Sequence, residues 1–259
     1  MKIARSLALI LLLNLVVAIP SLHAGNRRYF FQYSTIQALM EGIYDGDLTF
    51  RGLSKHGDFG IGTFNALDGE MIGVDGKFYQ VKMDGVAYPV VETTKTPFAN
   101  VTFFKSEKTI KLDKSVSYKE LEKCLGALLP SANLIYAIKI TGTFPFIKTR
   151  SVPRQQKPYP RLTDVVKQQA VFEFHKVNGV IVGFRTPSFL AGVNVAGYHL
   201  HFITEDRRAG GHVLDFRMGE ARIEISQMTE FDLQLPQNAE FLQKDLMVGG
   251  EKAIDRVER

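Results

Sequence analysis

The stretch DFGIGTFNALDGEMIGVDGKFYQVKMDGVAYPVV, residues 58–91, decides the fold class of this chain. Its apolar residues are divided by three Asp-Gly pairs, Asp68-Gly69, Asp75-Gly76 and Asp84-Gly85. An Asp-Gly pair between apolar runs is a strong indication of a β-hairpin, because tight hairpin turns require the positive φ angles that these residues tolerate. Three such pairs in succession predict an antiparallel meander.

Short helices are expected on either side of the meander. Ser34 with Gln37, and Ser117 with Glu120, have the spacing of a capping box. The first pair predicts a helix over Ile36, Leu39 and Met40, and the second predicts a helix that ends near residue 129. The only cysteine, Cys124, lies among leucines at helical spacing in the second helix, so we expect a small core residue rather than a nucleophile.

Strands dominate the rest of the chain. They are predicted at residues 101–112, 134–143, 171–176, 180–184, 193–204, 212–218 and 221–225. Asn178-Gly179 is predicted to turn the chain between two of them, and a short helix over residues 238–246 ends the regular structure. Strands outnumber helices and are not interleaved with them. The predicted class is therefore α+β, with two mainly antiparallel or mixed β-sheet domains and a few short helices.

The N-terminus has the layout of a secretory signal peptide. Lys2 and Arg5 precede an apolar run at residues 6–19, Pro20 ends the run, and Ala24 precedes Gly25. The run is short for a membrane span of about 20 apolar residues, so a cleaved signal at residues 1–24 is favoured over an uncleaved anchor. We therefore expect a secreted or periplasmic protein without stable membrane association after cleavage.

Charge and linker composition give the remaining expectations about organisation. The formal net charge of +5 falls to 5 − 2 = +3 when Lys2 and Arg5 leave with the signal. This excess is small, and the basic run at residues 148–161 is interleaved with prolines and glutamines, so no nucleic-acid partner is expected. The same region suggests a boundary between an N-terminal α+β domain, 25–155, and a C-terminal β domain, 156–259.

Three of the six histidines lie close together in the sequence. His199 and His201 lie two residues apart in a predicted strand, so both imidazoles face the same side, about 7 Å apart at the backbone. A polar turn ending in Gly210-Gly211 then leads to His212, and a hairpin can bring this imidazole beside the other two. Three histidines with room for a further ligand are typical of a catalytic zinc site. His56 and His175 are expected to be a loop residue and an ordinary strand residue.

Several longer motifs resemble those of the alpha-acetolactate decarboxylase family. The resemblance extends over essentially the whole mature chain, from residue 31 to the tail. The motifs that carry it are Phe31-Gln32-Tyr33-Ser34-Thr35, Gly60-Ile61-Gly62-Thr63-Phe64, Leu67-Asp68-Gly69-Glu70-Met71, Thr149-Arg150-Ser151-Val152-Pro153, Gly197-Tyr198-His199-Leu200-His201-Phe202 and Gly210-Gly211-His212-Val213-Leu214-Asp215.

The resemblance implies a zinc enzyme that converts (S)-2-acetolactate to (R)-acetoin and carbon dioxide. It assigns Zn²⁺ to the three histidines at 199, 201 and 212, and substrate binding to Thr63. It assigns catalytic roles to Glu70, Arg150 and a glutamate of the tail, for which Glu258 is the best match and Glu251 the other possibility. It also implies a small-molecule substrate, a homodimer, and a C-terminal zinc-binding domain with a catalytic tail.

Two other functions are compatible with parts of the sequence. Gly192, His199, His201 and Glu205 partly resemble the first motif of cupins, which would give a metal-dependent dioxygenase or isomerase with Glu205 as a ligand. The glycine spacing differs, and no second histidine-bearing cupin motif follows. A non-enzymatic zinc-binding or sugar-binding module is the third possibility, and it would leave Arg150 without a role.

Overall fold

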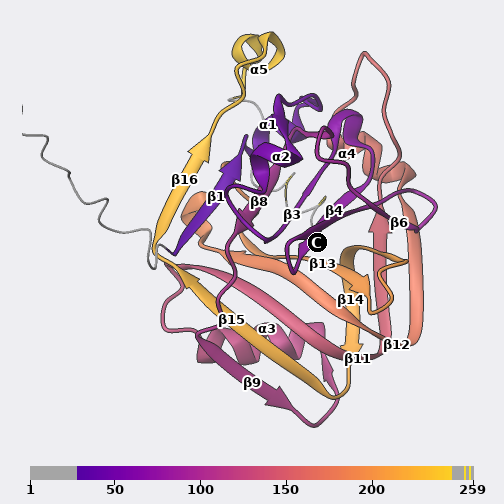
Figure 1. The fold of residues 1–259 in the computed structure, drawn as a ribbon, viewed down its shortest axis with the longest axis vertical. Helices are drawn as coiled ribbons and strands as arrows, with labels where there is room; N and C mark the ends of the chain where they lie inside the picture. The colour runs from indigo at the N-terminus through magenta and orange to yellow at the C-terminus, as the bar shows by residue number, and fades with distance from the viewer. Residues whose placement is uncertain (1–27, 247–253, 255–256, 258–259) are drawn as a thin grey trace, which may run out of the picture.

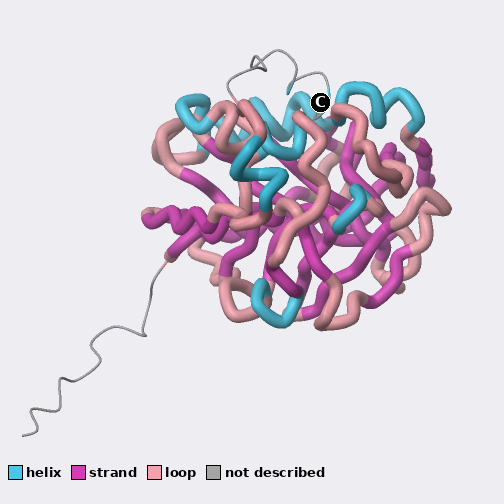
Figure 2. Tube along the Cα trace, turned by 90° about the horizontal axis from the view of Figure 1, so that it is seen from above, coloured by secondary structure: helices cyan, strands magenta, loops and turns pink. Residues whose placement is uncertain are grey.

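The computed structural model describes residues 28–246, 254 and 257. They form two seven-stranded sheets, a two-stranded sheet and several short helices, which confirms the predicted α+β class. Figure 1 shows the long strands crossing the molecule, and Figure 2 shows strands in its middle with helices at the outside. The predicted signal peptide, residues 1–24, lies outside the described residues.

The first sheet contains the meander, and its strand order is β16-β1-β8-β3-β4-β5-β6. The strands are β1 (Tyr29–Tyr33), β3 (Phe59–Thr63), β4 (Glu70–Val74), β5 (Lys77–Val81), β6 (Ala87–Pro89), β8 (Ala99–Thr102) and β16 (Glu230–Gln234). Strands β3 to β6 are successive antiparallel neighbours, so the prediction from the Asp-Gly pairs is confirmed. Asp75 and Gly76 have φ angles of 52° and 76°, the signs that a two-residue type I′ turn requires.

The second sheet closes on itself. Its order is β10-β14-β13-β12-β11-β15-β9, and β14 also pairs with β11. The strands are β9 (Lys108–Leu112), β10 (Val116–Ser117), β11 (Ile135–Ser151), β12 (Ala170–Thr186), β13 (Gly197–Thr204), β14 (Gly210–Met218) and β15 (Ala221–Met228). The extra pairing joins β11 to β14 into a ring of four strands. Phe144 lies inside it, with its ring centroid 5.2 Å from that of Phe202 and 6.1 Å from that of Phe216.

Apolar side chains hold the two sheets together. Phe30 and Ile61 of the first sheet lie in one cluster with Val182 and Ile203 of the second, and all four are 0% exposed. Burying this surface between the sheets is the main stabilising contribution of the interface. The two sheets therefore form one packed body, and side chains from both can line a common site.

The helices are short and lie at the outside. They are α1 (Ile36–Met40), α2 (Phe50–Leu53), α3 (Tyr118–Leu128), α4 (Leu162–Val165), α5 (Ala239–Gln243), and the 3-10 turns η1 (Asn65–Leu67), η2 (Val166–Gln168) and η3 (Ser188–Leu190). Strands β2 (Leu48–Thr49) and β7 (Lys95–Thr96) form the two-stranded sheet. None of the helices in the described part of the chain has the length and hydropathy that a membrane span requires.

One predicted capping box is confirmed and the other is displaced by one residue. Ser117 and Glu120 cap α3 as expected. At α1 the N-cap is Thr35, whose Oγ1 accepts a hydrogen bond of 3.2 Å from the amide of Ala38. Ser34 instead adopts a positive φ of 65° to connect β1 to the helix. Thr35 offers the same hydroxyl as serine, so the capping chemistry is as predicted although the residue is not.

The predicted turn at Asn178-Gly179 is wrong. Strand β12 continues without a break through both residues, and β11 is likewise one long strand. A Cβ at position 179 would lie 2.3 Å from the ring of Phe202 and 2.6 Å from the carbonyl oxygen of Ile203. The glycine therefore permits close packing of β12 against β13 rather than a reversal of the chain.

The prediction that Cys124 is a core residue is also wrong, because its side chain is exposed. Leu121 and Leu125 form the buried face of α3, at 2% and 1% exposure. Position 124 lies about 100° around the helix from position 125 and points away from the sheet.

Strands cross the predicted domain boundary in both directions. Strands β9, β10 and β11 precede residue 156 but belong to the second sheet, whereas β16 follows it and belongs to the first. The division into domains 25–155 and 156–259 stays a prediction. The two sheets themselves are not consecutive parts of the sequence.

The close contact at Gly179 gives a testable expectation. Gly179→Ala would force a methyl group into the Phe202 ring and should lower the free energy of unfolding by about 1–3 kcal/mol, the range for overpacked cores. Gly126→Ala in α3 is the control. A Cβ at position 126 would meet open space, and alanine loses less backbone entropy on folding than glycine, so this variant should be more stable by about 0.5–1 kcal/mol. Thermal denaturation measures both. Opposite shifts in Tm are expected, and a neutral Gly179→Ala would contradict the packing described.

Candidate metal and catalytic site

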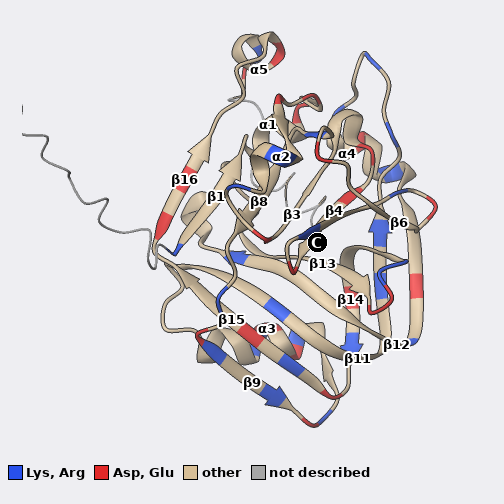
Figure 3. Ribbon diagram, in the orientation of Figure 1, with Lys and Arg blue, Asp and Glu red and all other residues tan. Residues whose placement is uncertain are grey.

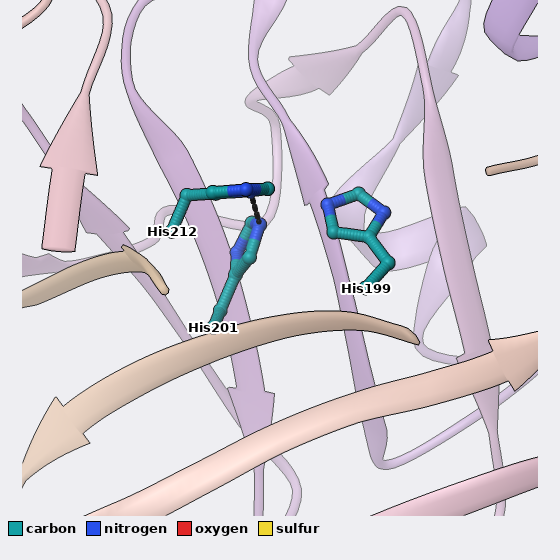
Figure 4. A group of neighbouring side chains, drawn as sticks. All are labelled: His199, His201 and His212. Atoms are coloured by element: carbon teal, nitrogen blue, oxygen red, sulfur yellow. Dashed lines mark hydrogen bonds between the residues drawn. The ribbon is translucent and has the colours of Figure 1, made fainter. Parts of the chain in front are cut away.

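Three buried histidines converge where the two sheets meet. His199 and His201 lie on β13 and alternate with Leu200 and Phe202, which point into the ring of strands. His212 on β14 lies directly opposite His201 in the strand register. One ring nitrogen from each histidine lies within 4.8 Å of the others, and Figure 4 shows the three rings turned toward one another. The sequence prediction that these three residues meet is confirmed.

A β-bulge in β14 determines which way His212 points. Phe216 and Val213 both lie in the core of the ring, although regular alternation would put residues three apart on opposite faces. The register between β11 and β14 shifts here, because Lys148 faces Asp215 but Thr149 faces Val213, which leaves Leu214 as the extra residue. The bulge reverses the faces of the residues that precede it. It therefore turns His212 out of the core and toward the other imidazoles.

A backbone carbonyl fixes the orientation of His201. Its Nδ1 lies 2.8 Å from the carbonyl oxygen of Met71 on β4, which accepts the Nδ1 proton. This tautomer leaves a lone pair on Nε2, which lies 3.3 Å from Nδ1 of His212. Histidines that bind metals commonly donate the proton of the second ring nitrogen to such an acceptor.

Burial keeps two histidines of the triad neutral. It lowers the pKa of His199 to about 3, and the nearby Arg150 guanidinium acts in the same direction. Burial, and then the neighbouring His199, lower the pKa of His201 well below its ordinary value. Both imidazoles are thus unprotonated near pH 7 and can donate lone pairs. Together with His212 they could hold a divalent metal ion with positions left for further ligands.

An ion pair between the two sheets lies beside the triad. Arg150 on β11 faces His212 in the strand register, and its Nη1 donates to Oε1 of Glu70 on β4 at 2.9 Å. The side chains are 4% and 8% exposed. The second carboxylate oxygen of Glu70 lies 3.7 Å from Nε2 of His201. Among the described residues, the buried Nε of Arg150 has no hydrogen-bond partner.

Thr63 is brought to the same place by β3. It lies directly opposite Glu70 in the strand register, and both are buried. The Thr63 hydroxyl donates to the carbonyl oxygen of Gly69 at 2.7 Å. Its proton is thus committed to the backbone, and what it can offer a bound molecule is an acceptor lone pair.

The remaining wall of the cavity is apolar. The triad, Arg150, Glu70 and Thr63 form one side, and the opposite side comes mainly from α1, α4 and their neighbours: Ile36, Leu39, Leu67, Phe98, Val152 and Leu162. A cavity of this kind suits a small molecule with charged and carbonyl groups at one end and methyl groups at the other.

The tail returns to this cavity. Ile254 and Val257 are buried at 4% exposure in the apolar cluster that includes Ile36 and Leu162. The carbonyl oxygen of Val257 accepts a hydrogen bond of 3.2 Å from Nη2 of Arg150. Glu251 and Glu258, the two glutamates predicted for the tail, lie outside the described residues.

The two remaining described histidines and the ligand of the cupin alternative lie elsewhere. His56 lies in a turn, where its ring stacks on Phe31 at 3.8 Å, and His175 is exposed on β12. Glu205, the extra ligand of the cupin alternative, is exposed and accepts a hydrogen bond from Asn178 at 3.2 Å. Among the described residues it does not belong to the group that could hold a metal, which does not favour the cupin alternative.

Two parts of the site were not predicted. The Met71 carbonyl carries no side-chain signature, because any residue supplies that acceptor. The apolar wall consists of leucines, isoleucines and a phenylalanine that in the sequence look like ordinary core residues. Their position at the cavity becomes visible only in the folded structure, where β4 and α4 lie at the same cavity.

Comparison with known proteins adds independent information. Residues 30–248 match the family model described as alpha-acetolactate decarboxylase. The alpha-acetolactate decarboxylase of Methanosarcina mazei is 49% identical over 243 residues, covering 93% of this chain and 84% of the relative. That of Bacillus subtilis is 46% identical over 216 residues, covering 83% and 85%. A crystal structure of the B. subtilis protein superposes with a TM-score of 0.87, covering 89% of this chain and 99% of the other.

The lowered pKa values of His199 and His201 make stability depend on pH. As pH falls below the ordinary histidine value of 6.5, the unfolded chain gains protons that buried His199 and His201 do not, so unfolding is favoured. The Tm of chelator-treated protein should therefore fall steadily from pH 7 to pH 4. A His199→Gln variant should show a shallower fall. His175→Gln, which removes an exposed imidazole, is the matched control and should follow the wild type; identical slopes in all three proteins would contradict the assignment.

Proposed function

The chain belongs to the alpha-acetolactate decarboxylase family, and from this membership we propose that it converts (S)-2-acetolactate to (R)-acetoin and carbon dioxide, using zinc. The observation that carries the proposal is the buried triad of His199, His201 and His212 beside the Glu70–Arg150 pair. The direct test is to incubate the purified protein with racemic acetolactate and to assay acetoin, with and without zinc.

The donor set supports zinc as the metal. Three imidazoles without a cysteine are the ligands of catalytic zinc sites, whereas structural zinc sites normally have four protein ligands. A bound Zn²⁺ would act as a Lewis acid toward substrate oxygens and stabilise negative charge that develops there. Neutral imidazoles leave the ion its full charge for this purpose.

Arg150 is proposed to position the substrate. Its guanidinium is planar and carries several N–H donors, and in the described part of the chain its buried Nε makes no hydrogen bond. A planar cation of this kind suits the substrate carboxylate or an oxygen that becomes negative. Glu70 holds the guanidinium in place at 2.9 Å, and the acceptor lone pair of Thr63 lies on the same side.

The proton balance of the reaction assigns a role to the tail. When the bond to the carboxylate carbon breaks, its electron pair moves into the neighbouring ketone to give an enediolate, and a proton must then reach carbon. A positioned carboxylic acid can deliver this proton. We assign this role to Glu258 on the family resemblance, and the hydrogen bond from Arg150 to the carbonyl oxygen of Val257, the preceding residue, supports it. Delivery from one side of the cavity would set the configuration of acetoin.

Further expectations belong to the same proposal. Export rests on the layout of residues 1–24, and a homodimer rests on the family resemblance. No nucleic-acid partner is proposed, because the mature charge is small and basic and acidic residues are interspersed along the strands in Figure 3.

The metal ligands can be tested directly. His201→Ala removes one of three ligands and should abolish both bound zinc and activity. His175→Ala is the matched control, since it removes an exposed histidine of the same chain and should leave zinc content unchanged. Metal analysis of both purified variants measures the outcome. One zinc per chain and full activity in His201→Ala would disprove the ligand assignment.

The role of Arg150 can be separated from its charge. Arg150→Lys keeps a cation near Glu70 but loses the planar fork, so the variant should fold and bind zinc. Its rate should fall at least about 100-fold, the scale of one lost electrostatic stabiliser. Steady-state kinetics with a metal analysis on the same sample gives the answer. Near-normal kinetics would leave Arg150 with a structural role only.

The tail requires a deletion and a substitution. Removing Glu258 and Arg259 leaves Ile254 and Val257, the buried anchors, in place, so the shortened protein should remain folded and bind zinc. Its decarboxylation should be severely impaired, and Glu258→Gln should have the same effect. Glu251→Gln is the matched control and should be mild. If the deletion has no kinetic effect, the proton must come from another group, although the metal site would be unaffected.

A further inference from the structure

Three buried amide side chains form a cluster outside the cavity. Gln32, Asn100 and Asn194 are at most 1% exposed. Asn194 Nδ2 donates to Gln32 Oε1 at 2.7 Å and to Asn100 Oδ1 at 3.1 Å, and its Oδ1 accepts from the amide of Val195 at 2.6 Å. Gln32 Nε2 in turn donates to the carbonyl oxygens of Ser34 and Val193, both at 2.7 Å. Both donor groups are therefore saturated.

The cluster joins the two sheets. Gln32 on β1 and Asn100 on β8 face each other in the first sheet, and Asn100 also faces Ile61 on β3, the strand that ends with Thr63. Asn194 lies in the loop between β12 and β13, five residues before His199. The amide cluster thus connects the strands behind Thr63 and Glu70 to the strand that carries two of the three imidazoles.

The backbone of this loop is held by the same surroundings. The carbonyl oxygen of Gly192 accepts from the amide of Gln37 at 3.2 Å, and that of Val193 accepts from the amide of Ile36 at 3.0 Å. The carbonyl oxygen of Val195 accepts from the Thr186 hydroxyl on β12. Three carbonyls of this loop are therefore bound to α1 and β12, and these bonds hold the segment before β13 in place.

Buried polar groups in this position indicate that the relative orientation of the segments they join matters, and not the stability of the fold alone. Burying an amide is unfavourable unless each of its polar atoms is bonded, and apolar side chains of the same size would fill the space without that constraint. A network in which the donors of Gln32 and Asn194 are all used restricts the arrangement of the groups it joins. The site needs such precision, because its parts come from different sheets and catalytic groups must be held within about 0.5 Å.

We propose that Asn194, held by Gln32 and Asn100, is a positioning residue that fixes His199 relative to Thr63 and Glu70. The role rests on the proposed metal site. It acts through the β12–β13 loop, since the described contacts of the amide cluster are with β1, β8 and that loop. Its loss should weaken metal binding more than the loss of an equally buried hydrogen bond elsewhere.

The test compares three variants for zinc affinity and stability. Asn194→Asp keeps the shape but replaces Nδ2 by an oxygen that faces both Gln32 Oε1 and Asn100 Oδ1, and Asn100→Leu removes one acceptor at similar volume. Thr102→Val is the matched control. Thr102 lies on β8, as Asn100 does, and the substitution removes the hydrogen bond of 2.9 Å that its hydroxyl donates to the carbonyl oxygen of Tyr29. Chelator competition measures zinc affinity, the visible absorption of cobalt(II)-loaded protein reports ligand geometry, and thermal denaturation reports stability.

Asn194→Asp should bind zinc about 10-fold more weakly, the lower end for outer contacts of metal sites, and should alter the cobalt spectrum. Asn100→Leu should show a smaller change in the same direction, and it decides the matter if Asn194→Asp does not fold. Thr102→Val should lower Tm without changing either metal readout. Wild-type affinity and spectrum in the amide variants would overturn the positioning role while the metal site stands. A wild-type protein that binds no zinc would overturn the metal site itself.

Discussion

The site depends on the pairing of β14 with two strands at once. Through β13 it places His212 opposite His201, and through β11 it places Arg150 opposite His212. Residues that face each other across antiparallel strands have Cβ atoms about 4.5–5.5 Å apart, so the three side chains are neighbours as soon as the ring of strands closes. The site is therefore a consequence of strand register, and a slip of one residue in either pairing would disperse it.

The first sheet contributes Glu70, whose buried charge lies against this row of side chains. Glu70 and Arg150 are almost fully withdrawn from water, and removing either partner of such a pair typically costs about 3–5 kcal/mol because the other charge is left uncompensated. The contact between the two sheets thus becomes sensitive to the loss of either charge. What it provides is a fixed cation beside the metal ligands in a cavity whose other wall is apolar, where electrostatic interactions are stronger than in water.

Sequence patterns were sufficient wherever the determinant was local. The Asp-Gly turns, the capping box at Ser117 and the strand alternation of His199 and His201 are read from adjacent residues, and the structure confirms them. The errors arose where distant contacts decide. Gly179 has the neighbours of a turn residue, but the Phe202 ring that requires a glycine there comes from another strand. Cys124 has helical spacing, but which side of α3 faces the sheet is set by packing at Leu121 and Leu125. The apolar wall was missed for the same reason.

Because of the bulge at Leu214, the directions in which the side chains of β14 point depend on the number of its residues and not only on their identity. The Leu214 side chain is only half-buried, so substitutions at this position would have little effect on the packing of the strand. The number of residues between His212 and Phe216 is more constrained. Losing or gaining one residue there would exchange the inward-facing and outward-facing side chains at the start of the strand. Among diverging descendants of this chain, selection should therefore tolerate varied residues at the bulge and reject changes of length there.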